Sequence, residues 1–158
     1  MDNESNDTQE YFGEFTHRVD ASRRVNYPTK WLPAVQEGQV KRIVFVLTLW
    51  PKAAEGPCIR GSTVEKLAEL LKEINAIDSS KPEKGRLKRL IGGGSEKIEV
   101  DGQYRFVLPQ AMAAAAGIEK EAILVGMMDR FEIWSPQRWA AVKQSDATHA
   151  ADDFSIME

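Results

Sequence analysis

Apolar residues along this chain gather in short runs and helical stripes, separated by polar turns. Residues 43–49 and 122–127 are apolar and β-prone, and each run is followed by a second strand pattern, around residues 57–60 and 130–134. A helix is predicted after each pair of strands. The first follows a capping box that begins at Ser62, and the second has Ser135 as its cap and Pro136 at its first position.

One polar pattern occurs twice beside these elements and reads Asp-x-x-x-Arg, an apolar residue, two further positions and Pro. The fixed positions of the two copies are separated by the same 81 residues: Asp20 and Asp101, Arg24 and Arg105, Pro28 and Pro109. Each Pro begins a short helical stretch that a Gly closes, over residues 28–38 and 109–117. Internal repetition indicates two copies of one small β-rich unit.

The duplicated unit resembles the MraZ family, bacterial transcriptional regulators built from two tandem SpoVT-AbrB-type domains. The resemblance covers roughly residues 11–142. It rests on the two motifs, on Phe12 and Gly13 before the first, on the basic helix that ends at Gly92, and on residues 124–126 and 131–134. It implies an α+β fold of two β-rich units with short helices, related by pseudo-twofold symmetry.

The resemblance also implies a function. Members of the family bind short repeated DNA sequences upstream of the division and cell-wall gene cluster, and they assemble into rings. This chain departs from the family at the residue before each motif Arg, which is usually Gly but here is Arg23 or Tyr104. Because Gly there commonly marks a backbone turn with positive φ, either both turns have another shape or the chain tolerates some strain.

The repeat and the charge pattern together predict five segments. These are an acidic disordered tail (1–10), a first repeat (11–80), a basic linker helix with a glycine turn (81–96), a second repeat (97–142) and a second acidic disordered tail (143–158). The whole chain has a net charge of −3. The tails carry −4 and −3, so residues 11–142 carry +4, which permits DNA binding without proving it.

The motif residues have complementary predicted roles. The carboxylates of Asp20 and Asp101 can accept backbone N–H groups and fix the shape of a turn. Arg24 and Arg105 offer planar donor forks suited to phosphate oxygens or a guanine edge, and the resemblance implies that both face DNA. The first copy is expected to dominate because it has more basic neighbours, namely Arg18, Arg23 and Lys30. The alternative is that each Asp–Arg pair only closes a hairpin.

Strand alternation makes a further prediction about these motifs. Residues two apart lie on one face of a strand, so Val25 with Tyr27, and Phe106 with Leu108, should frame a shared core while both motif Arg side chains face away. The basic linker over residues 81–89 could contact phosphate. The favoured interpretation is a solvated helix whose apolar residues pack inward: Leu87, Leu90 and Ile91.

The sequence gives no support for an enzyme. Residues 92–95 are glycine-rich but match neither the Walker nor the dinucleotide-binding pattern. With one Cys and two His, no metal cluster of convincing spacing can be drawn, so no catalytic residue, metal or cofactor is predicted. No apolar run is long enough to cross a bilayer. Cys58 is expected to pack in the core, and the expected location is the cytoplasm, at the nucleoid.

The sequence therefore predicts a sequence-specific regulator whose partners are double-stranded DNA and further copies of itself, with no membrane. Small β-rich units with exposed strand edges need partners to cover them, and the family suggests a ring-like homo-oligomer. The alternative function is an oligomeric protein-interaction scaffold, a degenerate or antitoxin-like AbrB fold that does not bind an operator. The discriminating feature is whether Arg24 and Arg105 share one face.

Overall fold

The computed structural model describes residues 9–33, 42–51 and 54–158. The first repeat contains, in order, β1 (Glu14–Arg18), β2 (Arg24–Asn26), the 3-10 turn η2 (Thr29–Trp31), β3 (Val44–Trp50), β4 (Cys58–Ser62) and α1 (Val64–Asn75). The linker helix α2 (Pro82–Gly93) follows. The second repeat contains β5 (Ser95–Glu99), β6 (Arg105–Val107), α3 (Gln110–Ala116), β7 (Glu121–Gly126), β8 (Phe131–Trp134), α4 (Pro136–Phe154) and the 3-10 turn η3 (Ser155–Met157).

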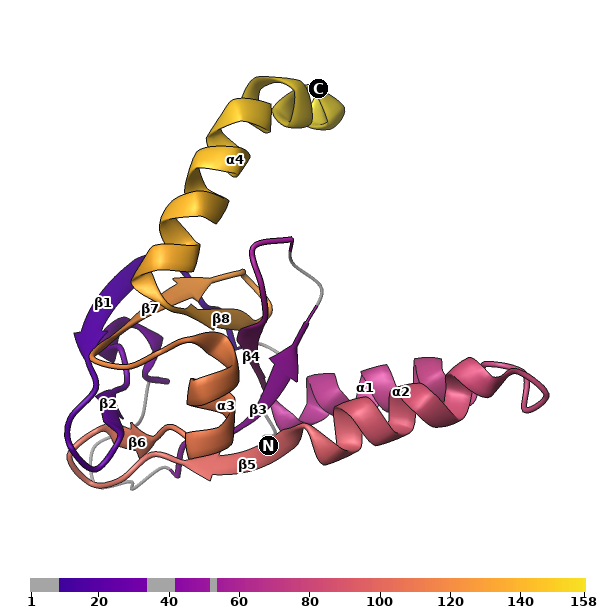
Figure 1. Ribbon diagram of the computed structural model, residues 1–158, viewed down its shortest axis with the longest axis horizontal. Helices are drawn as coiled ribbons and strands as arrows, with labels where there is room; N and C mark the ends of the chain where they lie inside the picture. Colours follow the sequence, from indigo (N-terminus) through magenta and orange to yellow (C-terminus); the bar gives the residue numbers. More distant parts are fainter. Residues whose placement is uncertain (1–8, 34–41, 52–53) are drawn as a thin grey trace.

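Strands of both repeats form one six-stranded antiparallel sheet in the order β1-β7-β8-β4-β3-β5 (Figure 1). The corresponding strands of the two repeats are β1 and β5, β3 and β7, and β4 and β8. Exchanging the members of each pair gives the same strand order in reverse. The counterparts β2 and β6 pair with each other in a separate antiparallel ribbon. The two repeats are therefore related by pseudo-twofold symmetry, as predicted, and they share one sheet.

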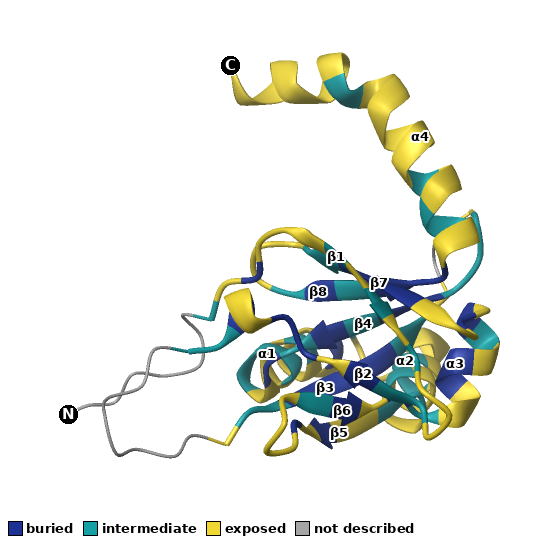
Figure 2. Ribbon diagram, turned by 90° about the vertical axis from the view of Figure 1, so that its left-hand side faces the viewer, coloured by how far each residue is buried: buried dark blue, intermediate teal, exposed yellow. Residues whose placement is uncertain are grey.

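The four core residues predicted from strand alternation are buried. Val25, Tyr27, Phe106 and Leu108 belong to one hydrophobic cluster that also takes side chains from the sheet and from α3. The buried positions run through the sheet and the ribbon, as Figure 2 shows. Because both motifs contribute to this one cluster, neither repeat has a complete core without the other.

Aromatic rings fill the centre of this core. The ring of Phe131 on β8 lies 5.0 Å, centroid to centroid, from both Tyr11 and Trp31, and 5.4 Å from Phe45. Gly61 on β4 lies under the same ring, and a Cβ atom at Gly61 would collide with it. The glycine thus allows a large aromatic side chain to pack directly against the backbone of β4.

The sequence predicted a cap for each of the helices that follow the two strand pairs, α1 and α4, and one of the two predictions needs a correction. Ser135 caps α4, because its hydroxyl accepts from the backbone N–H of Arg138 (3.1 Å). The capping box predicted from Ser62 to Glu65 is wrong, because the cap is Thr63 and the third helical position is then Lys66, which is not the Glu or Gln of a capping box. Ser62 ends β4, and the hydroxyl of Thr63 accepts from the backbone N–H of Lys66 (3.0 Å). Both residues carry a hydroxyl that could cap the helix. Ser62 is still paired with Val46 in β4, so Thr63 is the first residue free to take the cap position.

The predicted disordered tail over residues 143–158 is wrong. α4 continues to Phe154, and η3 follows it. Ala is the strongest helix former and is frequent between residues 140 and 151. Contacts with Glu14 on β1 also anchor the start of the helix: its carboxylate accepts from Trp139 Nε1 (3.0 Å) and lies 3.3 Å from Lys143 Nζ.

The linker helix is also less buried than predicted. α2 lies beside α1, and together they form a hairpin that extends from the body (Figure 1). Leu87 and Ile91 are half-buried, but Leu90 is 65% exposed, so the expectation that it packs inward is wrong. None of the helices within the described ranges is long and apolar enough to cross a membrane.

Parts of the predicted first repeat, and with it of the first short helix, fall outside the described residues, as does most of the N-terminal tail. Of the acidic tail over residues 1–10, only residues 9 and 10 are described, and Gln9 Nε2 donates to the carbonyl of Trp31 (3.0 Å). Of the helix predicted over residues 28–38, the turn η2 is present, whereas residues 34–38 lie outside the described ranges. Its counterpart α3 ends as predicted at Gly117, which has a left-handed backbone (φ 72°).

Candidate nucleic-acid interface

The first motif forms a tight turn between β1 and β2, held by a single carboxylate. Asp20 Oδ1 accepts from the backbone N–H groups of Ser22 (2.9 Å) and Arg24 (2.8 Å). Its other oxygen, Oδ2, accepts from Arg24 Nε (2.8 Å). Asp20 and Arg24 are also joined through the backbone, since Asp20 N–H donates to the carbonyl of Arg24 (3.1 Å). The turn therefore fixes both the backbone and the guanidinium of Arg24.

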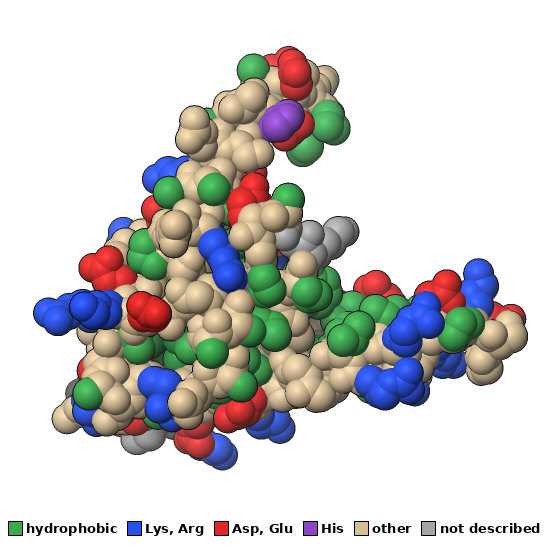
Figure 3. All heavy atoms as spheres, viewed as in Figure 1, with side chains coloured by type: hydrophobic (Ala, Val, Ile, Leu, Met, Phe, Trp, Pro, Cys, Tyr) green, Lys and Arg blue, Asp and Glu red, His purple; other side chains and the backbone are tan. Residues whose placement is uncertain are grey.

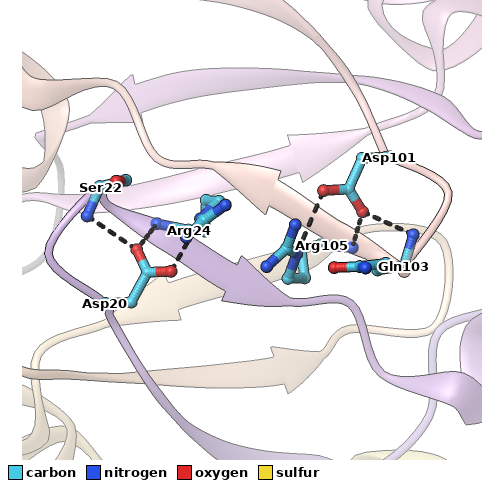
Figure 4. Close-up of polar contacts among 6 residues, drawn as sticks. All are labelled: Asp20, Ser22, Arg24, Asp101, Gln103 and Arg105. Carbon is cyan, nitrogen blue, oxygen red and sulfur yellow. Dashed lines mark hydrogen bonds and ion pairs between the residues drawn. The ribbon is translucent and has the colours of Figure 1, made fainter.

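The second motif repeats every one of these contacts between β5 and β6 (Figure 4). Asp101 Oδ1 accepts from the N–H groups of Gln103 and Arg105, both at 2.9 Å, and Oδ2 accepts from Arg105 Nε (3.1 Å). Asp101 N–H donates to the carbonyl of Arg105 (2.7 Å). Within the described ranges, no terminal guanidinium nitrogen of Arg24 or Arg105 has a hydrogen-bond partner, so both forks remain available to a ligand.

Backbone strain is present at the same place in both turns. Arg23 has φ 62° and Tyr104 has φ 61°, the left-handed conformation that the family's usual Gly adopts without cost. The turns thus keep their shape, and the chain tolerates the strain. At Arg23 a compensating contact exists, because its Nε donates to the carbonyl of Leu108 in the other repeat (3.2 Å).

Replacing Tyr104 by Gly is expected to stabilise the fold. A non-Gly residue in the left-handed region costs roughly 1–2 kcal/mol, while the extra freedom of Gly in the unfolded chain offsets about 0.5–1 kcal/mol of the gain. We expect the free energy of unfolding in urea to rise by about 0.5–1 kcal/mol. Tyr104→Ala is the matched control, since it removes the same ring but keeps Cβ. Equal stabilities of the Gly and Ala variants would contradict stored strain.

The two turns meet across the β2–β6 ribbon. Arg24 lies opposite Val107, and Asn26 lies opposite Arg105, in an antiparallel register. The middle residue of each strand is buried, so these four side chains share the outer face. Arg24 and Arg105 therefore stand on one face, related by the pseudo-twofold axis, and neither is buried against the core.

The pKa values of the Asp20 and Asp101 carboxyls are lowered by the groups that hydrogen-bond to them. The backbone N–H of Arg24 hydrogen-bonds Asp20 and holds the pKa of that carboxyl below its usual value, and the guanidinium contributes in the same direction. The backbone N–H and guanidinium of Arg105 lower the pKa of Asp101 in the same way. Both carboxyls are thus ionised at neutral pH and keep each guanidinium oriented.

The other basic residues predicted around the first motif lie in different places. Arg23 is directed to the carbonyl of Leu108, as described above. Lys30 is exposed on η2. Arg18 is exposed at the end of β1, where it lies opposite Glu121 and lines a hollow with Glu119. Of the predicted basic residues, only those of the two motifs lie on the ribbon's outer face, and the setting of Arg18 is partly acidic.

Two outer-face residues were missed from the sequence. Asn26 lies two positions after Arg24 on β2, and Val107 lies two positions after Arg105 on β6. Each therefore shares the face of its motif Arg, and each is paired with the motif Arg of the other strand. Alternation along the strand could have identified them. They also make the face asymmetric, because the first repeat offers an amide at this position and the second offers a small apolar side chain.

Comparison with known proteins identifies the family of this chain. Residues 91–155 match the family described as "MraZ protein, putative antitoxin-like". The transcriptional regulator MraZ of Thermomicrobium roseum is 32% identical over 133 residues, which cover 83% of this chain and 85% of that protein. The chain belongs to the MraZ family. This membership confirms both the resemblance and the SpoVT-AbrB-type α+β fold class.

Two further MraZ relatives support the same conclusion over more of the chain. The transcriptional regulator MraZ of Herpetosiphon aurantiacus is 34% identical, covering 89% of this chain and 91% of the relative. That of Acidithiobacillus ferrooxidans is 30% identical, covering 92% and 95%. An alignment over 92% of the chain includes both Asp–Arg turns, so the MraZ likeness extends to the whole ribbon.

Proposed function

We propose that this chain is a sequence-specific DNA-binding transcriptional regulator that acts upstream of a division and cell-wall gene cluster, as its family implies. The observation that carries the proposal is the β2–β6 ribbon. It presents Arg24 and Arg105 on one face, each held by a carboxylate through Nε and each with its terminal nitrogens free within the described ranges. A hairpin-closing role alone would not require both guanidinium groups to share an outer face.

The chemistry of the ribbon's outer face supports a role in base readout. The major groove of B-DNA admits a two-stranded β-ribbon, and a guanidinium fork can donate to both O6 and N7 of guanine. The outer face offers two further reading groups. The amide of Asn26 suits adenine N6 and N7, and the side chain of Val107 suits the methyl group of thymine. We therefore propose these four residues as the specificity surface, with unequal contributions from the two repeats.

The proposal includes assembly. Neighbouring copies in a ring-like homo-oligomer would present the ribbon repeatedly, which fits the short repeated DNA sequences that the family implies. Each copy adds its own contacts, so the affinity for an array of sites exceeds that of one copy for one site. Such a regulator would act in the cytoplasm, at the nucleoid.

The test is a titration of the full chain against two duplexes of equal length. One comes from upstream of the chain's own gene and the other has the same bases in scrambled order. We expect at least a roughly thousandfold preference for the first duplex by fluorescence anisotropy, as specific binders show. Affinity for both duplexes should fall as salt rises, because phosphate contacts release counterions.

A second candidate function is the oligomeric interaction scaffold without operator binding. The observation that favours it is the exposure of large apolar side chains away from the ribbon, among them Leu90 on α2 and Phe154 at the end of α4. Equal affinity for the two duplexes, or no binding even at low salt, would support the scaffold and overturn the regulator.

A further inference from the structure

An apolar groove runs between α1 and α2 on the hairpin that leaves the body. Its volume is about 520 Å³, and its lining includes Leu67, Leu71, Ile74 and Ile91, with Lys88 as the charged residue at its edge. Leu71 is 48% exposed. Figure 3 shows apolar side chains gathered along this hairpin, with basic side chains beside them. Apolar grooves lined in this way receive the apolar face of a helix in helix-in-groove recognition.

A second exposed apolar feature lies at the far end of α4. From residue 143 to residue 158 every residue is exposed except Ala150, which is half-buried. This C-terminal arm carries Phe154, Ile156 and Met157, which are 72%, 81% and 83% exposed. Phe154 lies one α-helical turn after Ala150 at the end of α4, and Met157 follows on the 3-10 turn η3. Large apolar side chains clustered at the end of an arm indicate a contact surface.

We propose that the C-terminal arm of one copy occupies the α1–α2 groove of a second copy of this chain. Phe154 and Met157 would fill the groove beside Leu71 and Ile74. The proposal specifies an interface for the assembly proposed above, and it does not depend on DNA binding.

The positions of the arm and the groove favour a contact between copies. In Figure 1 the arm and the α1–α2 hairpin leave the body in different directions. One copy therefore offers an arm on one side and a groove on another. A contact of this head-to-tail kind involves two different surfaces, and it generates a ring when the rotation between copies closes.

Charge also matches the arm to the groove. Asp152, Asp153 and Glu158 flank the apolar residues of the arm. On α2, Arg86, Lys88 and Arg89 form no ion pair with any residue in the described ranges. Opposite charges around an apolar contact set its orientation and speed its formation. A basic partner segment would lack this complementarity.

Cross-linking of two variants tests the contact directly. Leu71→Cys and Phe154→Cys are purified separately, mixed in equal amounts and treated with a short bismaleimide. We expect linked dimers in the mixture and few from either variant alone, because the contact joins two different surfaces. The native Cys58 does not interfere, since it is buried and burial raises the pKa of its thiol to about 12.

The matched control replaces Leu71→Cys by Met128→Cys, which lies in the turn between β7 and β8 and is also exposed. Linking of Phe154→Cys to this position as efficiently as to Leu71→Cys would overturn the proposal. A double variant carrying Cys at 71 and 154 gives a further outcome. Cross-links only within single chains would also overturn it, because the arm would then reach the groove of its own copy.

Light scattering at micromolar concentration gives an independent measurement. Phe154→Asp combined with Met157→Asp should lower the assembly mass at least twofold without disturbing the fold, since both side chains are exposed. Met128→Asp should leave the mass unchanged. Lys88→Glu should weaken assembly, because it places an acidic group opposite the acidic arm. Adding Asp153→Lys to this variant should restore assembly, because the two charges are then exchanged.

The outcomes separate the interface from the assembly. If the wild-type protein is an oligomer and the double variant Phe154→Asp, Met157→Asp has the same mass, the proposed interface is wrong, but the assembly is not. A monomeric wild-type protein would overturn both the interface and the proposed ring, while leaving the DNA titration as a separate question.

Discussion

Arg24→Ala is expected to remove most of the chain's affinity for its operator. Loss of one bidentate contact to a base costs about 1–3 kcal/mol, or roughly a 5- to 160-fold loss of affinity for each contacted site. Every copy in an assembly repeats the loss, so the effects multiply along an array of sites. The measurement is anisotropy of the upstream and scrambled duplexes at two salt concentrations.

Arg105→Ala should weaken operator binding less than Arg24→Ala. The two guanidinium groups have the same contacts with their carboxylates, so the difference must come from their surroundings. In the proposed interface Asn26 would add a second base-reading group to the first repeat, whereas Val107 would add only an apolar contact. Equal losses from both variants would show that the two repeats read DNA equally.

Two further variants make the result specific. Arg24→Lys keeps the charge and loses the planar fork, so it should retain affinity for scrambled DNA while losing preference for the upstream duplex. Arg130→Ala is the control for charge. It removes an Arg that also pairs with a neighbouring carboxylate, Asp129, but lies in the turn just before β8, outside the ribbon. If Arg24→Ala bound DNA as well as Arg130→Ala does, Arg24 would have no role in recognition.

Much of the fold followed from the sequence because the repeat is visible in it. The positions of Asp20 and Asp101 fixed the alignment of the two copies, and alternation placed Val25 and Phe106 in the core. What alternation cannot supply is the partner of each strand. A strand such as β1 has one apolar side whichever neighbour it pairs with, so the sharing of one sheet between repeats had to come from the structure.

The candidate site was also predictable from the repeated motif, but two structural features of the chain were not. The Asp–Arg spacing indicated the turn, but the residue types could not decide whether Arg23 and Tyr104 take positive φ, since strain depends on the surrounding contacts. Net charge misled the prediction for the C-terminal tail. An acidic, polar segment is typical of disorder, yet the cap at Ser135 and the contacts of Trp139 lead it into a helix.

The largest expected effect on stability comes from Phe131→Ala. This side chain is fully buried at the centre of the aromatic cluster, between Tyr11, Trp31 and Phe45. Replacing a buried Phe by Ala costs about 3–5 kcal/mol, a large part of the stability of a small domain. Urea unfolding at one fixed protein concentration should show this loss, since assembly makes stability depend on concentration.

Gly61 supplies the internal check on this prediction. Gly61→Ala alone should destabilise by roughly 1–3 kcal/mol, because its new Cβ collides with the ring of Phe131. With Phe131→Ala already in place the collision is gone, so the second substitution should cost much less, and the two losses should not add. Phe12→Ala, at an exposed Phe, should change stability by no more than about 0.5 kcal/mol. Strictly additive losses at Gly61 and Phe131 would show that the ring does not pack on this strand, and with it the shared core of the two repeats would have to be redrawn.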